Sequence, residues 1–140
     1  MSIKVVLDTN IYISALLVPG SNPDKIIHLA INKFLEIYIS PEILKELENN
    51  LVKKFEYTDK EAKEVIIWLE SIARIIKPVH SIANVCKKDS DHCILECAMS
   101  GGADFIVSGD KKHLLSIKKY SNIEIISPAE FLKKIMNDNA

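Results

Sequence analysis

The sequence contains few of the residues that mark several common protein classes. Of its 140 residues only 4 are Gly, 5 are Pro and 3 are Cys. This leaves no Gly-, Pro- or Ser-rich linker, no repeat and no disulfide framework. We therefore expect residues 1–140 to form a single domain. The odd number of cysteines and the absence of an apolar signal region behind a basic start indicate a reduced, cytoplasmic protein.

Arginine is almost absent as well. Arg74 is the one arginine among 18 basic residues, so 17 are lysines (18 minus 1), and 19 acidic residues bring the formal net charge to -1. This balance excludes a histone-like polyanion binder. Contacts to nucleic acid would come from local lysine patches, because bidentate guanidinium clamps are largely missing. No apolar run approaches the ~18 residues of a membrane span, so we expect no membrane contact.

Short apolar runs alternate with longer stretches of helical period. Helices are expected where serine caps precede proline, at Ser40-Pro41 and Ser127-Pro128. Such alternation predicts an α/β fold of three layers, α/β/α, with a central, mainly parallel sheet. The expected strands are residues 3–7, 35–39, 105–107 and 123–126, and further helices are expected after Thr58-Asp59 and from Asp91 to Ser100.

Carboxylates follow two of these apolar runs. Asp8 comes directly after the first run, and Asp110 follows residues 105–107. Either one alone is as readily explained as a turn former or helix cap, but ligands of parallel sheets bind beyond the carboxyl ends of the strands. Asp91 shares a helical stripe with Ile94 and Leu95 that should face the sheet, although Asp91 or Asp89 could equally be an N-cap.

A convergence of Asp8, Asp91 and Asp110 would be costly unless a cation offset their repulsion. Oxygen ligands without a nearby His or Cys cluster suit Mg²⁺ or Mn²⁺ rather than Zn²⁺, which makes phosphoryl chemistry the leading class. Two lysine pairs flank the acidic motifs and could hold a polyanion beside such a site. These are Lys87-Lys88 and Lys111-Lys112.

Four motifs in this order resemble the PIN domain, most closely the bacterial and archaeal toxins of toxin–antitoxin systems, the VapC-like ribonucleases. They are Val6-Leu7-Asp8-Thr9-Asn10, the helix around Glu46, the run from Asp91 to Ala98, and Ala103 to Asp110. The resemblance implies a metal-dependent endoribonuclease that hydrolyses single-stranded RNA, with a small antitoxin as partner and a homodimer as the usual assembly.

The resemblance also assigns roles. Asp8, Glu46, Asp91 and Asp110 would bind Mg²⁺ or Mn²⁺ and activate the attacking water. Thr9, Asn10 and Ser108 match the polar residues that surround this site in the family. Glu46 depends on the resemblance, because helical periodicity places both Glu46 and Glu48 at the flanks of the apolar stripe and does not choose between them.

Three positions depart from the family pattern. Lys88 stands where an acidic residue is common, and Asp89 comes one step later. Lys112 replaces a further Asp, so an auxiliary carboxylate is missing. His92 replaces Asn or Asp, and we expect its side chain to point away from the core stripe.

Two other functions are compatible with the sequence. The missing auxiliary carboxylate would suit a PIN scaffold that binds RNA or protein with little or no turnover. Acidic clusters at strand ends also serve phosphoryl transfer to or from small molecules, with Asp8 as the nucleophile. Zinc is disfavoured, because Cys93 and Cys97 have no second ligand pair and are expected to pack in or near the core. Neither a catalytic triad nor a Gly-rich phosphate loop is present.

Overall fold

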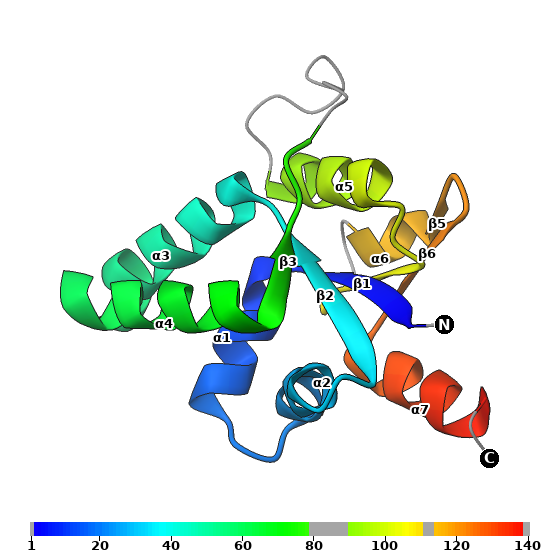
Figure 1. The fold of residues 1–140 in the computed structure, drawn as a ribbon, viewed down its shortest axis with the longest axis horizontal. Coiled ribbons are helices and arrows are strands. Elements are labelled where there is room, and N and C mark those ends of the chain that lie inside the picture. Colours follow the sequence, from blue (N-terminus) through cyan, green and yellow to red (C-terminus); the bar gives the residue numbers. More distant parts are fainter. Residues whose placement is uncertain (1, 79–89, 111–113, 139–140) are drawn as a thin grey trace.

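The computed structural model describes residues 2–78, 90–110 and 114–138, and within them six strands form one sheet in the order β3-β2-β1-β4-β6-β5 (Figure 1). Every neighbouring pair is parallel except β5 and β6, which are antiparallel. The strands are β1 (Ile3–Leu7), β2 (Leu35–Ile39), β3 (Ala73–Ile75), β4 (Phe105–Val107), β5 (Lys119–Tyr120) and β6 (Ile123–Ile126).

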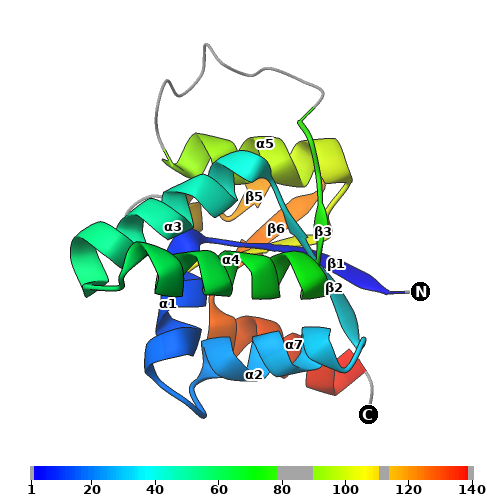
Figure 2. The same ribbon diagram turned by 60° about the vertical axis from the view of Figure 1, so that its left-hand side comes forward.

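Helices cover both faces of this sheet. Helix α5 lies over β1, β2 and β4, while α2 and α7 lie side by side on the opposite face (Figures 1 and 2). Helices α3 and α4 pack against each other and project from one side of the sheet. The bounds are α1 (Thr9–Leu17), α2 (Asn22–Ile31), α3 (Pro41–Phe55), α4 (Asp59–Ile72), α5 (Ser90–Gly101), α6 (Leu114–Ile117) and α7 (Pro128–Asp138). The predicted three-layer α/β fold with a mainly parallel sheet is confirmed.

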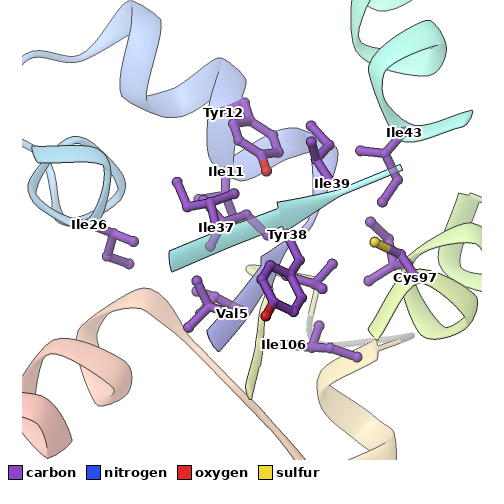
Figure 3. Packing of buried hydrophobic residues seen from close by; sticks show 14 of the residues in the cluster. Val5, Ile11, Tyr12, Ile26, Ile37, Tyr38, Ile39, Ile43, Cys97 and Ile106 are labelled. Carbon is purple, nitrogen blue, oxygen red and sulfur yellow. The ribbon is translucent and has the colours of Figure 1, made fainter. Parts of the chain in front are cut away.

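The central strands are buried on both faces, as parallel sheets covered by helices require. Val5, Val6 and Leu7 of β1 are each fully buried. In β2, Ile37 lies near Ile11 of α1, and Tyr38 points to the other side of the sheet (Figure 3). This alternation explains why β1 and β2 are almost continuously apolar in sequence.

The predicted helix starts and stops are found in the structure. Ser40 Oγ accepts a hydrogen bond from the Ile43 amide at 3.2 Å, and Ser127 Oγ accepts one from the Glu130 amide at 3.2 Å. Gly102 follows α5 with a φ of +68°, a left-handed conformation that glycine adopts at little cost. The two serine side chains thus pair with backbone amides that the helix starts leave unpaired.

The cysteines of α5 contribute to packing, as expected. Cys97 is buried and Cys93 is half-buried, whereas Cys86 lies outside the described residues. Burial, together with the nearby charge of Glu42, raises the pKa of the Cys97 thiol to about 12. A thiol that stays protonated is a poor metal ligand. None of the helices in the described part of the chain is long and apolar enough to cross a bilayer.

Candidate functional site

The adjacent ends of β1 and β4 bring Asp8, Ser108 and Asp110 together. Leu7 pairs with Val107 in the parallel ladder, and the Asp8 amide donates a hydrogen bond to the Val107 carbonyl at 2.9 Å. Ser108 Oγ donates to Asp8 Oδ2 at 2.9 Å and accepts from the Asp110 amide at 3.0 Å. One hydroxyl therefore connects the carboxylate after β1 to the backbone of the aspartate after β4.

The electrostatics of Asp8 favour a bound cation. Asp8 is only 5% exposed. Burial raises the pKa of the Asp8 carboxyl, the negative charge of Asp110 raises it further, and the hydrogen bond from Ser108 acts in the opposite direction. A buried carboxylate beside a second carboxylate is stabilised in its charged form by a positive ion.

Thr9 connects a third carboxylate to this edge of the sheet. It is the first residue of α1 and is buried, and its Oγ1 donates a hydrogen bond to Glu46 Oε1 of α3 at 3.1 Å. Glu48 is two residues further along α3, a rotation of about 200° around the helix axis, so it cannot share the direction of Glu46. The contact to Thr9 thus distinguishes the two glutamates that helical periodicity left open.

Asp91 lies in the first turn of α5 and is half-buried. Ile94, Leu95 and Ala98 on the same stripe are buried, as predicted. Helix α5 runs back over the sheet, so it begins above the side where β1 ends and α1 begins (Figure 2). The four predicted acidic residues therefore belong to chain segments that reach the same edge of the sheet.

The four carboxylates do not form one compact group. Within residues 2–78, 90–110 and 114–138, no three acidic, histidine or cysteine side chains are close enough together to form a metal-binding cluster. The structure connects Asp8 with Asp110 and Thr9 with Glu46, and Asn10 beside them is exposed. That all four acids share one ion stays a prediction.

A comparison of the whole sequence with models of protein families is consistent with the polar residues at the ends of β1 and β4. The family model of the PIN domain matches residues 4–112 of this chain. The chain belongs to the PIN domain family. A relative, the uncharacterized protein MJ1680 of Methanocaldococcus jannaschii, is 32% identical over an alignment 146 residues long. The alignment covers 96% of this chain and 92% of the relative.

Three solved structures have a fold similar to that of this PIN domain, and two of them are VapBC complexes. VapBC2 of Rickettsia felis, bound to a DNA fragment from its promoter, matches with a TM-score of 0.63 and 19% identity over 89% of this chain and 98% of the other. DNA-bound VapBC of Salmonella typhimurium matches with a TM-score of 0.62 and 17% identity over 90% and 98%. PAE2754 of Pyrobaculum aerophilum matches with a TM-score of 0.62 and 14% identity over 97% and 90%. The likeness to these structures is one of fold.

One expectation for this PIN domain was wrong. His92 does not point into solvent but is buried, with 7% of its surface exposed. Its Nε2 lies 3.7 Å from Glu96 Oε2, one turn along α5, and neither ring nitrogen has a hydrogen-bond partner in the described part of the chain. Helix α5 contacts both the sheet and α3, so burial on this helix extends beyond the stripe of Asp91, Ile94, Leu95 and Ala98.

Sequence analysis assigned no role to Tyr12, which lies on α1 four residues after Asp8. Its hydroxyl is buried and has no hydrogen-bond partner among the described residues. Burial raises the pKa of Tyr12, with smaller contributions from the nearby Cys97 and Asp8. The available signal was the spacing of four residues from Asp8, the N-cap of α1, which sets Tyr12 one turn into that helix. The lysines expected to contact RNA, Lys87, Lys88, Lys111 and Lys112, lie outside the described residues.

Proposed function

We propose that this PIN domain is a metal-dependent endoribonuclease that hydrolyses phosphodiester bonds of single-stranded RNA. The observation that carries the proposal is the Asp8–Ser108–Asp110 connection at the carboxyl ends of β1 and β4, in a chain of the PIN family. Burial and the neighbouring Asp110 raise the pKa of the Asp8 carboxyl, and a bound cation would favour its charged form. The geometry therefore supports chemistry that uses a divalent ion.

Asp8, Glu46, Asp91 and Asp110 would hold Mg²⁺ or Mn²⁺, because carboxylate oxygens are the ligands these ions prefer. A divalent ion bound there supplies Lewis acidity, lowering the pKa of water and stabilising charge on the phosphate oxygens. The chain's own polar groups fix the carboxylates in place. Ser108 orients Asp8, and Thr9 orients Glu46. Asn10 is exposed beside them and is available to the RNA.

Cleavage of a fluorescent single-stranded RNA by the purified full chain tests this function. We expect cleavage with Mn²⁺ or Mg²⁺, loss of cleavage with EDTA, and at least a 100-fold loss in Asp110→Asn, because mutation of one electrostatic group at such a site costs about 10²–10³ in rate. Cleavage that survives Asp110→Asn would overturn the mechanism. Calorimetry that detects no binding of Mn²⁺ at millimolar concentration would instead support a scaffold that binds RNA or protein without turnover. Trapping a phosphorylated Asp8 would indicate phosphoryl transfer to small molecules.

We further propose that the chain is the toxin of a toxin–antitoxin pair and acts in the cytoplasm as a homodimer. The fold likeness to VapBC complexes from two organisms supports a small antitoxin as partner. Light scattering measures the mass of the isolated protein. Expression in a bacterial host should arrest growth, and Asp110→Asn should abolish that arrest. Normal growth with active, soluble wild-type enzyme would exclude the toxin role and leave an RNA-processing nuclease.

A further inference from the structure

Helices α2 and α7 lie side by side on the face of the sheet opposite α5 (Figures 1 and 2), and their side chains line an open groove. Its volume is about 660 Å³. Phe34 directly precedes β2, so the groove reaches the amino ends of the strands, whereas Asp8 lies at the carboxyl ends. The lining residues are Lys25, His28, Leu29, Asn32, Phe34, Leu132, Ile135 and Met136.

The apolar part of this α2–α7 groove is unusually exposed. Phe34 is 67% exposed and Met136 is 70% exposed. Leu29 and Leu132 between them are half-buried, and Ile135 is buried. Large apolar side chains gathered in one concave surface mark an interaction site more often than scattered exposed residues do.

Lys25 gives the lining of the groove a positive charge. Lys25 and His28 are its titratable lining residues, and no acidic side chain lines it in the described part of the chain. The nearest acid on α2, Asp24, accepts the Gly20 amide at 2.8 Å and lies 3.4 Å from His28 Nε2. Exposed Lys33 adds a further positive charge next to Phe34 in the sequence. Two copies meeting through this surface would repel each other, whereas an acidic partner would be attracted.

We propose that the α2–α7 groove is a docking surface for an amphipathic helix of another protein, with its apolar side against Phe34 and Met136 and Asp or Glu residues facing Lys25 and His28. Helix α2 has 10 residues, about 15 Å, so the groove matches roughly three turns of a partner helix. Apolar anchors at i, i+3, i+4 and i+7 are the usual pattern of such binding. A small polar ligand is disfavoured, because few polar groups converge in the groove. This proposal is independent of nuclease activity.

A designed peptide of 14 residues tests the groove directly. The probe carries Leu at i, i+3, i+4, i+7 and i+8 and Glu at the flanking positions, and the control peptide has Lys in place of each Glu. Fluorescence polarisation with the full chain should show binding of the Glu peptide that weakens as salt is raised, and at least tenfold weaker binding of the Lys peptide. Equal binding of the two peptides, or no binding of the Glu peptide, would overturn the proposal.

Three variants locate the binding. Phe34→Ser and Lys25→Glu should each weaken binding of the Glu peptide about tenfold. Ile67→Ser on α4, where Ile67 is 65% exposed, is the matched control and should leave binding unchanged. Circular dichroism confirms that each variant is folded. The proposal fails if Ile67→Ser weakens binding as much as Phe34→Ser. It also fails if Phe34→Ser halves the mass measured by light scattering, which would assign the groove to a second copy, or if vesicles with anionic lipid compete equally well for the groove.

Discussion

At the scale of single residues, Asp8 carries the main electrostatic feature of this PIN domain. It is the one buried carboxylate among the described residues, and its pKa is raised by burial and then by Asp110. Ser108 offsets part of this cost by donating a hydrogen bond at 2.9 Å. The folded protein therefore keeps a buried carboxylate at some cost in stability, which is common at functional sites.

The sign of this effect leads to a prediction for Asp8→Asn. Because the pKa of Asp8 is higher in the folded than in the unfolded state, its contribution to stability is full below about pH 4 and is lost as the pH rises through the raised pKa. Asn remains neutral and can still accept the hydrogen bond from Ser108. In EDTA at pH 7 we expect Asp8→Asn to melt at a higher temperature than wild type, and we expect the difference to vanish near pH 3.

Added Mn²⁺ should reverse this order. Wild type gains stability in proportion to RT ln(1 + [Mn²⁺]/Kd), whereas Asp8→Asn has lost a ligand and gains little. Thermal melts with and without 5–10 times the apparent Kd of Mn²⁺ measure both effects. If Asp8→Asn melts below wild type in EDTA at pH 7, then the burial cost assigned to Asp8 is wrong.

Glu46 and Glu48 provide a matched pair for the proposed site. Both are half-buried residues of α3, but Glu46 accepts the hydrogen bond from Thr9. Glu46→Gln should lower the cleavage rate about 10- to 100-fold and weaken the affinity for Mn²⁺, while Glu48→Gln should leave both near wild type. The RNA cleavage assay and Mn²⁺ titration calorimetry separate the two. Equal losses in both variants would contradict the role given to Glu46.

At the scale of elements, the packing of α5 on β2 depends on one close approach. A Cβ atom added to Gly101 would lie 2.6 Å from Cδ2 of Tyr38 and 3.3 Å from Cγ1 of Ile76. Tyr38 is buried under this helix and cannot easily move away. The last turn of α5 therefore needs glycine for its contact with the sheet, not for its φ angle, which is outside the left-handed region.

Gly101→Ala should accordingly lower the free energy of unfolding by about 1–3 kcal/mol. Helix propensity alone would predict the opposite sign, a gain of up to about 1 kcal/mol. Gly109→Ala is the control, because no atom lies within 4 Å of an added Cβ there, and it should be neutral or slightly stabilising. Urea denaturation measures each variant. A cost for Gly101→Ala that does not decrease in a Tyr38→Leu background would contradict the clash.

At the scale of the whole molecule, charge is distributed rather than concentrated. A net charge of -1 with 19 acidic residues gives little long-range attraction for RNA. A divalent ion among the proposed carboxylates would add two positive charges at the site. RNA affinity should then depend on both metal and salt, with binding through lysine point charges.

This distribution of charge can be tested by measuring RNA binding to Asp110→Asn, a variant that is not expected to cleave. For about three phosphate contacts to single-stranded RNA, affinity should fall about 20-fold between 50 and 200 mM salt. The slope of log affinity against log salt concentration reports the number of phosphate contacts. Alanine at both Lys111 and Lys112 should lower that number by more than one, because this pair follows Asp110 in the sequence. Alanine at both Lys53 and Lys54, exposed near the end of α3, is the control. A larger effect of the control pair would place the RNA elsewhere.

Most of the fold could be predicted because its signals are local. The strand at residues 3–7, the Ser40 cap and the glycine stop after α5 depend on neighbouring residues. Helices α1, α2 and α6 and the short strand β5 were not predicted. Strand β5 has two residues and no apolar run of its own, since it forms only by pairing with β6. His92 was placed wrongly for a related reason, because its burial depends on which elements surround α5.

The sequence by itself determined the fold class, the helix caps and the residue types at the strand ends, because each follows from periodicity, capping or composition within a few residues. Only the tertiary structure decided that Ser108 connects Asp8 to Asp110, that Thr9 donates a hydrogen bond to Glu46, and that an apolar groove lies along α2 and α7. Asp8 and Ser108 are 100 residues apart. Contacts over such a separation exist only because the parallel sheet sets the carboxyl ends of β1 and β4 side by side.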